Sequence, residues 1–212
     1  MSLTRVLLVR HADVENPGRV LYGQLPGFPL SARGRVQATA LGERLRRAGL
    51  QRIVHSPQER AAETARLIAA QLEGPLPLVA DPRLREADFS RYLQGVPYWQ
   101  VPIRRPLWFV HKARRGLLPG DETVAEMGGR VLEVVRQLAR ELPGGAAACI
   151  GHADPLQAAW VLLEGRAQSE RELYRKQFDR AGVLRVELEG EIPVRWDYER
   201  PPMVEVPARP AA

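Results

Sequence analysis

The stretch Val6-Leu7-Leu8-Val9-Arg10-His11-Ala12 decides the fold of this chain. Its four apolar residues predict a short buried strand, and a cation and an imidazole follow directly at the carboxyl end. Ligands of open α/β sheets bind at that end of the strands. A second stretch, Ala146-Ala147-Ala148-Cys149-Ile150-Gly151-His152-Ala153, repeats the pattern. Either histidine alone is as often a polar residue leaving the core, but the pair with Arg10 favours a site in which the two rings face each other.

The composition is that of an ordinary globular protein. The chain has 212 residues, of which 45% are hydrophobic and 26% charged, and this length favours one domain with a substantial core. No apolar run reaches the length of about 18 residues that a membrane span needs, and no basic segment followed by an apolar block predicts a signal peptide. The single cysteine, Cys149, allows no internal disulfide and is expected in the core. Together these features predict a cytoplasmic protein with no membrane partner.

The charge is strongly positive, with a formal net charge of +6. Such a balance suits a nucleic-acid binder. The arginines, however, are spread along the whole chain and interleaved with glutamates, and no zinc-finger or RNA-binding aromatic signature is present. We therefore expect no nucleic-acid partner and favour a small phosphorylated molecule, which the same field attracts. The oligomeric state is left open, with a homodimer as one option.

Expected strands and helices alternate along the chain. The strands cover residues 6–9, 52–55, 76–79 and 146–150, with a hairpin over 183–188 and 192–196, and helices are capped or opened at Ser31, Ser56, Thr123, Asp154 and Ser169. The pattern predicts a three-layer α/β/α fold with a mostly parallel central sheet and an antiparallel hairpin. We expect one domain over residues 1–199, an inserted lid at about 90–119, where periodicity is lost, and a disordered tail over 200–212.

Two details of the helices can be checked against a structure. The first helix is expected to bury Val36, Ala40, Leu41 and Leu45. Ser56 is expected to cap the second helix, with Pro57 in its first turn and Glu59 completing a capping box. Arg60 follows, and because helical side chains lean toward the N-terminus, it can reach back to the strand ends.

The side chains expected at one sheet edge are His11, His152, Arg10, Arg60 and Glu86. A metal site needs more converging ligands and would be opposed by two guanidinium groups, so no metal is predicted. No Gly-x-Ser-x-Gly pattern indicates a serine hydrolase. Two arginines favour an oxyanion held by forked N–H pairs. A neutral imidazole among them can attack phosphorus, and Glu86 can protonate the leaving alcohol if its pKa is raised.

Several stretches resemble, in order from about residue 3 to 163, the histidine phosphatase superfamily in its phosphoglycerate mutase-like branch. Leu8-Val9-Arg10-His11-Ala12-Asp13 is similar to that family's Arg-His-Gly-Glu signature. Ser56-Pro57-Gln58-Glu59-Arg60-Ala61 with Thr64-Ala65 is similar to its Ser-Pro-x-x-Arg-Ala-x-x-Thr-Ala helix. The other similar blocks are Tyr22-Gly23-Gln24, Pro29-Leu30-Ser31, Leu84-Arg85-Glu86-Ala87-Asp88-Phe89, Gly120-Asp121-Glu122-Thr123 and Gly151-His152-Ala153.

The resemblance implies that His11 is phosphorylated, that Glu86 is the acid and that no cofactor is used. It also implies a set of phosphate-binding residues, which are Arg10, Arg60 and His152, with Asn16 and Gln24 as further candidates. The chain departs from the pattern in three places: Ala12 and Ala153 replace glycines, and Asp13 replaces a glutamate. In the mutases of this family an asparagine usually stands six positions after the phosphorylated histidine. Six positions after His11 this chain has Pro17, and its asparagine, Asn16, lies one position earlier.

Three functions follow from this reading, and a phosphatase acting on a small phosphomonoester is preferred. A phosphoglycerate mutase-type phosphotransferase is second, and an inactive phospho-ligand binding module is third. Substrate choice is expected to depend on residues 90–119 and on the loop at residues 16–29.

Overall fold

The computed structural model describes residues 3–88, 93–118 and 120–204, and its centre is a six-stranded sheet. The strand order is β3-β2-β4-β1-β5-β6. The strands are β1 (Thr4–Arg10), β2 (Arg52–His55), β3 (Leu78–Ala80), β4 (Ala146–Gly151), β5 (Val183–Glu189) and β6 (Ile192–Glu199). Strands β1 to β4 pair in parallel, whereas β5 and β6 are antiparallel. The predicted mostly parallel sheet with an antiparallel hairpin is therefore confirmed.

The register of β1 against β4 brings the two histidines together. Arg10 is paired with Gly151, and the His11 amide donates to the Gly151 carbonyl at 2.9 Å. His11 and His152 therefore follow adjacent parallel strands at the same level. Both rings are positioned by the strands that they directly follow, and no long loop separates either histidine from the sheet.

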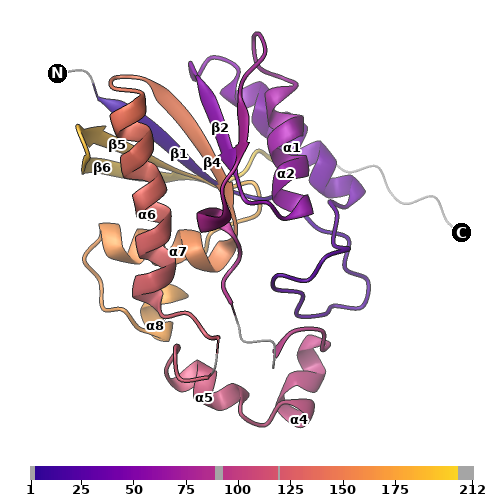
Figure 1. Cartoon of the computed structure of the whole chain (residues 1–212). Coiled ribbons are helices and arrows are strands. Elements are labelled where there is room, and N and C mark those ends of the chain that lie inside the picture. The colour runs from indigo at the N-terminus through magenta and orange to yellow at the C-terminus, as the bar shows by residue number, and fades with distance from the viewer. Residues whose placement is uncertain (1–2, 89–92, 119, 205–212) are drawn as a thin grey trace, which may run out of the picture.

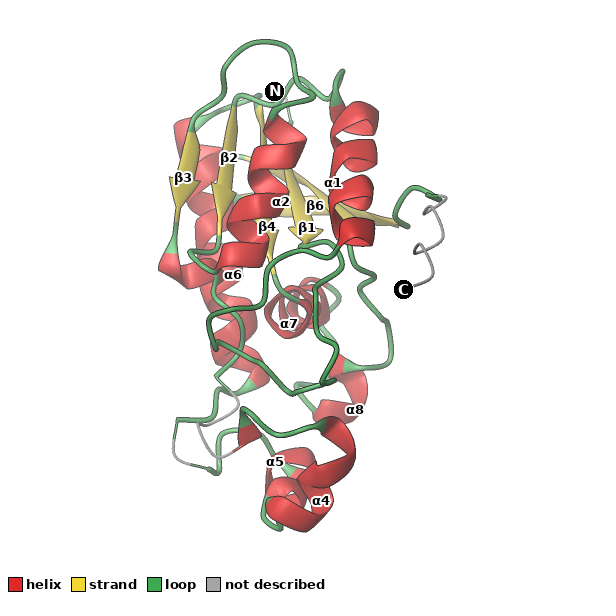
Figure 2. Cartoon of the chain, turned by 90° about the vertical axis from the view of Figure 1, so that its right-hand side faces the viewer, coloured by secondary structure: helices red, strands yellow, loops and turns green. Residues whose placement is uncertain are grey.

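Helices cover both faces of the sheet (Figure 2). Alternate side chains of β1, Leu7 and Val9, pack with α1 (Ala32–Leu45) and α2 (Glu59–Ala69) on one face. Val6 and Leu8 pack on the other face with α6 (Val124–Glu141) and α7 (Ala153–Leu163). Two-sided burial explains why the central residues of β1 and β4, Val6 to Val9 and Ala146 to Ile150, are apolar in succession instead of alternating. The α/β/α layering is confirmed.

The helix starts agree with the sequence in part. Ser31 caps α1, and Thr123 and Glu126 form the predicted capping box of α6. On α1, Leu41 and Leu45 are buried as expected, but Val36 is exposed. The buried face of α1 also includes Gly34, Gln37, Ala38 and Gly42. The face of the helix that packs on the sheet is therefore rotated about the helix axis relative to the predicted face.

The start of α2 corrects a prediction. The helix begins at Glu59 with Gln58 as its N-cap, and the cap residue makes no side-chain bond to the helix. The capping box expected at Ser56 and Glu59 is therefore absent from this helix. The Ser56 hydroxyl bonds His152 and Gln58 instead.

Between β3 and α6, an excursion leaves the sheet and lies below it in Figure 1. It carries α4 (Val101–Arg104) and α5 (Trp108–Ala113) after a 3-10 turn at Tyr98–Gln100. The predicted lid at about 90–119 overlaps this excursion, and its residues 90–92 and 119 lie outside the described part, as do residues 205–212 of the predicted tail. A short helix, α8 (Glu170–Leu173), follows α7. No helix in the described ranges combines the length and apolarity of a membrane span.

Candidate active site

The two histidine rings form the centre of the candidate site. Their centroids are 5.0 Å apart and their planes are tilted by 59°. Nδ1 of His11 lies 2.8 Å from the Ala12 carbonyl. A carbonyl only accepts, so Nδ1 carries the proton of the neutral ring and Nε2 keeps its lone pair. Burial, and then the charges of Arg60 and Arg10, hold the His11 pKa well below its ordinary value. The His11 ring is therefore neutral at physiological pH, with a free lone pair on Nε2.

The predicted arginines both lie beside the histidine pair. Arg60, in the first turn of α2, is only 1% exposed, and its Nη2 donates to the Gly23 carbonyl at 2.7 Å. Its guanidinium lies over the Tyr22 ring, 4.7 Å from the centroid. Nη1 of Arg10 donates to the Phe178 carbonyl at 2.6 Å. Backbone carbonyls thus orient both cations while other donor atoms remain for a ligand.

Four buried nitrogen atoms around this centre have no hydrogen-bond partner in the described part of the chain. They are Nε of Arg10, Nε of Arg60, Nδ1 of His152 and Nε2 of Gln58. Unpaired buried donors cost free energy and are rare in folded proteins. The two guanidinium Nε atoms and the Gln58 amide are N–H donors, and beside the neutral His11 ring they form a site that suits an anion with several oxygens.

Glu86 lies at the same edge, as predicted. Its Oε1 accepts from the Ala87 amide at 2.9 Å, and its Oε2 is 3.8 Å from Nδ1 of His152. Burial, and then the negative charge of Asp154, raise the Glu86 pKa to about 7, while Arg60 opposes this shift. The carboxyl therefore carries a proton for a substantial part of the time near neutral pH.

Further residues that support the site were not predicted. Ser56 Oγ lies 2.9 Å from Nε2 of His152, and both residues are fully buried. Thr64 Oγ1 accepts from the Ala12 amide and donates to the Arg60 carbonyl at 2.7 Å. Thr64 thus links the His11 loop to α2. Thr64 lies four residues, or one helical turn, after Arg60, and this spacing could have predicted that it lies beside Arg60 at the site.

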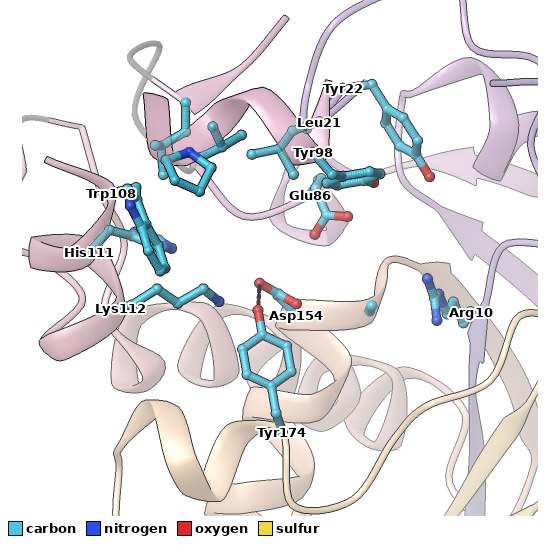
Figure 3. Close-up of a pocket in the computed structure, with 15 residues that line it drawn as sticks. Arg10, Leu21, Tyr22, Glu86, Tyr98, Trp108, His111, Lys112, Asp154 and Tyr174 are labelled. Carbon is cyan, nitrogen blue, oxygen red and sulfur yellow. Dashed lines mark hydrogen bonds between the residues drawn. The ribbon is translucent and has the colours of Figure 1, made fainter. Parts of the chain in front are cut away.

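A cavity of about 480 Å³ opens beside the histidines. Figure 3 shows Arg10 at one end and Trp108 and His111 at the other. The cavity meets the buried centre through Arg10, Gly23 and Glu86. The other lining residues are Leu21, Tyr22, Leu93, Tyr98, Val101, Pro102, Trp108, His111, Lys112, Ala153, Asp154 and Tyr174.

Asn16 and Gln24, the weaker phosphate-binding candidates, are bonded to backbone groups. The Asn16 amide donates to the Val20 carbonyl and accepts from the Val20 amide. Nε2 of Gln24 donates to the Glu86 carbonyl at 2.9 Å. Gln24 thus lies next to the acid, whereas Asn16 closes its own loop, and their part in phosphate binding stays a prediction.

The departures from the family pattern fit the backbone. The described non-glycine residues with positive φ are Arg19 and Ala181, so neither Ala12 nor Ala153 adopts a conformation that needs glycine. Asp13 accepts from the Ser31 hydroxyl at 2.6 Å. The alanines therefore add no backbone strain at the site.

A third histidine, His55, ends β2 at the same sheet edge but is not part of the pair. Its Nδ1 bonds the Ser56 carbonyl at 2.8 Å. Among the described residues, no group of three or more histidine, cysteine or carboxylate side chains is placed to hold a metal ion.

Comparison with known proteins identifies the family. Residues 6–196 match the sequence profile of the histidine phosphatase superfamily (branch 1). The chain is 34% identical over 168 residues to Rv0525 of Mycobacterium tuberculosis, covering 77% of this chain and 80% of that protein. It is 32% identical over 148 residues to a probable phosphoglycerate mutase GpmB of Yersinia enterocolitica, covering 68% and 66% of the two chains.

Solved structures agree with this assignment at the level of the fold. Bacillus stearothermophilus YhfR superimposes with a TM-score of 0.80 at 23% identity, covering 90% of this chain and 94% of that one. The mycobacterial glucosyl-3-phosphoglycerate phosphatase Rv2419c gives a TM-score of 0.76 at 23% identity, with 92% and 96% covered. The profile match, together with the histidine pair at the sheet edge, shows that this chain belongs to the histidine phosphatase superfamily, branch 1.

Proposed function

We propose that this protein is a phosphatase that hydrolyses a small phosphomonoester through a phosphohistidine on His11. The observation that carries the proposal is the neutral His11 ring beside the buried, unpaired Nε donors of Arg10 and Arg60. A ring with a fixed Nδ1 proton offers Nε2 to phosphorus, and the donors are placed to hold charge that develops on the phosphoryl oxygens.

The first step transfers the phosphoryl group to the enzyme. The lone pair of His11 Nε2 forms a bond to phosphorus as the bond to the ester oxygen breaks. The leaving oxygen keeps that electron pair and takes the proton of the Glu86 carboxyl. Asp154 supports this step because its charge helps to raise the Glu86 pKa to about 7.

The second step regenerates the enzyme. Ionised Glu86 takes a proton from water, and the water oxygen attacks the phosphohistidine. The nitrogen–phosphorus bond breaks, its electron pair returns to Nε2, and inorganic phosphate leaves. Glu86 is protonated again, so each proton and electron pair is accounted for by side chains of this chain.

A phosphoglycerate mutase-type transferase is the second candidate, favoured by the 32% identity to a probable phosphoglycerate mutase GpmB. A mutase must keep water from the phosphohistidine while its substrate reorients. The cavity at the site is far larger than a single water, with a volume of about 480 Å³. A cavity of this size accommodates the alcohol of a phosphomonoester and also the reorienting substrate of a mutase, so the two functions are separated by the assay that follows.

The test measures phosphate release from an alkyl phosphate and from 3-phosphoglycerate, with and without a bisphosphoglycerate primer. We expect primer-independent release and an acid-labile phosphoryl group on His11 by mass spectrometry. His11→Ala should abolish both, while His55→Ala, which changes a histidine outside the His11–His152 pair, should keep most of the activity. Rapid primer-dependent isomerisation with negligible phosphate release would overturn the proposal.

A further inference from the structure

The part of the cavity beyond the histidines has an apolar wall. Leu21 comes from the loop between β1 and α1, Leu93 and Tyr98 come from the excursion before α4, and Val101, Pro102 and Trp108 come from α4 and α5. Figure 3 shows Trp108 at the end farthest from Arg10. A group attached to a phosphate held at Arg10 would therefore extend along apolar and aromatic side chains.

The basic side chains at this distal end already have carboxylate partners. Nζ of Lys112 lies 2.7 Å from Glu170, and Nδ1 of His111 lies 2.9 Å from Asp121. Because Lys112 is paired with Glu170 and His111 is hydrogen-bonded to Asp121, this end of the cavity offers little attraction to a second anionic group on a ligand.

The acidic side chain nearest this end is likewise engaged. Oδ2 of Asp154 accepts from Nη2 of Arg115 at 2.6 Å and from the Tyr174 hydroxyl at 2.9 Å. Positive charge is thus concentrated at Arg10 and Arg60, where one phosphate would bind. The remainder of the lining is apolar or internally neutralised.

We infer that the preferred substrate carries one phosphate on an apolar, ring-containing alcohol, and that Trp108 determines this preference. The inference rests on the proposed phosphatase function and names its substrate class. A cavity of about 480 Å³ lies within the range of roughly 300–1,000 Å³ that is typical of sites for drug-sized ligands. Burying a ring against such a wall stabilises the complex, whereas a carboxylate or second phosphate would lose hydration there without gaining a partner.

The first experiment compares three esters whose leaving groups are alcohols, so that leaving-group chemistry does not dominate. These are 2-(1-naphthyl)ethyl phosphate, glycerol 3-phosphate and 3-phosphoglycerate. We expect kcat/KM for the naphthyl ester to exceed both others by about tenfold or more. Equal values, or a preference for 3-phosphoglycerate, overturn the inference and leave the proposed phosphatase function standing.

A matched pair of variants tests whether Trp108 determines the preference for the naphthyl ester. Trp108→Ala should lower kcat/KM for the naphthyl ester by about tenfold and change that for glycerol 3-phosphate by less than about twofold. Trp99→Ala removes a tryptophan of the same segment that is 71% exposed and does not line the cavity, and it should leave both values unchanged. An equal loss for both esters in Trp108→Ala, or the same loss in Trp99→Ala, refutes the assigned role.

A binding measurement separates the inference from the chemistry. Calorimetry with the wild-type protein compares the naphthylethyl phosphonate with methylphosphonate, neither of which can be hydrolysed. We expect the naphthyl compound to bind about tenfold more tightly, and Trp108→Ala to remove most of that difference. Equal affinities overturn the inference even if every ester is hydrolysed, whereas absent hydrolysis with the expected affinities refutes only the proposed phosphatase function.

Discussion

The pKa of Glu86, raised to about 7, predicts how activity changes with pH. If Glu86 must be protonated to release the alcohol, the active fraction is about one half at pH 7, roughly one tenth at pH 8 and roughly one hundredth at pH 9. On the acid side, the pKa of His11 lies well below 6.5, so its lone pair is available at pH 6.5. We therefore expect kcat/KM to fall nearly tenfold per pH unit above pH 7.5.

The assay is steady-state phosphate release from an alkyl phosphate between pH 6 and 9. The second ionisation of a phosphate ester lies near pH 6, so the substrate contributes little to the change above pH 7. Glu86→Gln should lower activity by about 10²–10⁴-fold and should remove the alkaline limb. A wild-type profile that is flat to pH 9, or an alkaline limb that persists in Glu86→Gln, would show that another group donates the proton.

The same pKa shift predicts a change in stability. The folded-state pKa of Glu86 is raised from 4.5 to about 7, so the folded protein binds more protons than the unfolded chain between these values. The stability contribution of the carboxyl is fully present below pH 4.5 and is lost as the pH rises through 7. Glu86→Gln should therefore gain stability relative to wild type at pH 8 compared with pH 5, as measured by urea unfolding. No difference between the two pH values would contradict a raised pKa.

Two further predictions concern packing and proton placement. A Cβ on Gly34 would lie 2.0 Å from the Asp13 carbonyl oxygen, so Gly34→Ala should lower the free energy of unfolding by about 1–3 kcal/mol. In the control Gly129→Ala, the new methyl group on α6 meets nothing within 4 Å, and the free energy of unfolding should rise by about 0.5–1 kcal/mol. A loss of stability in both variants would contradict the clash at Gly34. Ser56→Ala removes the 2.9 Å hydrogen bond to His152 and should lower the free energy of unfolding by about 1–3 kcal/mol. ¹⁵N NMR of the His152 ring should show an altered distribution of the proton between its two nitrogens. An unchanged ring spectrum would refute the role of Ser56 in orienting His152.

The sequence was enough to predict the pairing of the two histidines. Val6 to Val9 and Ala146 to Ile150 are apolar on both faces, as expected for central parallel strands, and parallel strands end at one edge. The position of Arg60 follows from its place in the first turn of a helix that starts at that edge. Glu86 was expected at the same edge, and the family resemblance supported it as the acid, although no periodic element carries it to the site.

Other features could not be read from local patterns. Ser56 carries strong helix-capping signals, yet its hydroxyl bonds Gln58 and a histidine far away in sequence, and it does not cap α2. Val36 lies in a helix whose inner face also accepts Gln37 and two glycines, so apolarity alone misplaced that face. Trp108 belongs to a segment without periodicity, and its approach to the cavity depends on how short helices fold back.

In the proposed mechanism, the residues at the sheet edge react with the phosphate, and the residues of the excursion contact the alcohol that carries it. In this mechanism the phosphoryl group is held by residues that follow or begin β1, β4 and α2, whereas much of the far wall comes from one segment inserted between β3 and α6. Exchanging residues 93–118 for the equivalent stretch of a relative would thus change which alcohol is released without changing how fast the phosphorylated enzyme is hydrolysed. A single scaffold of this kind can serve many substrates while its reaction stays the same.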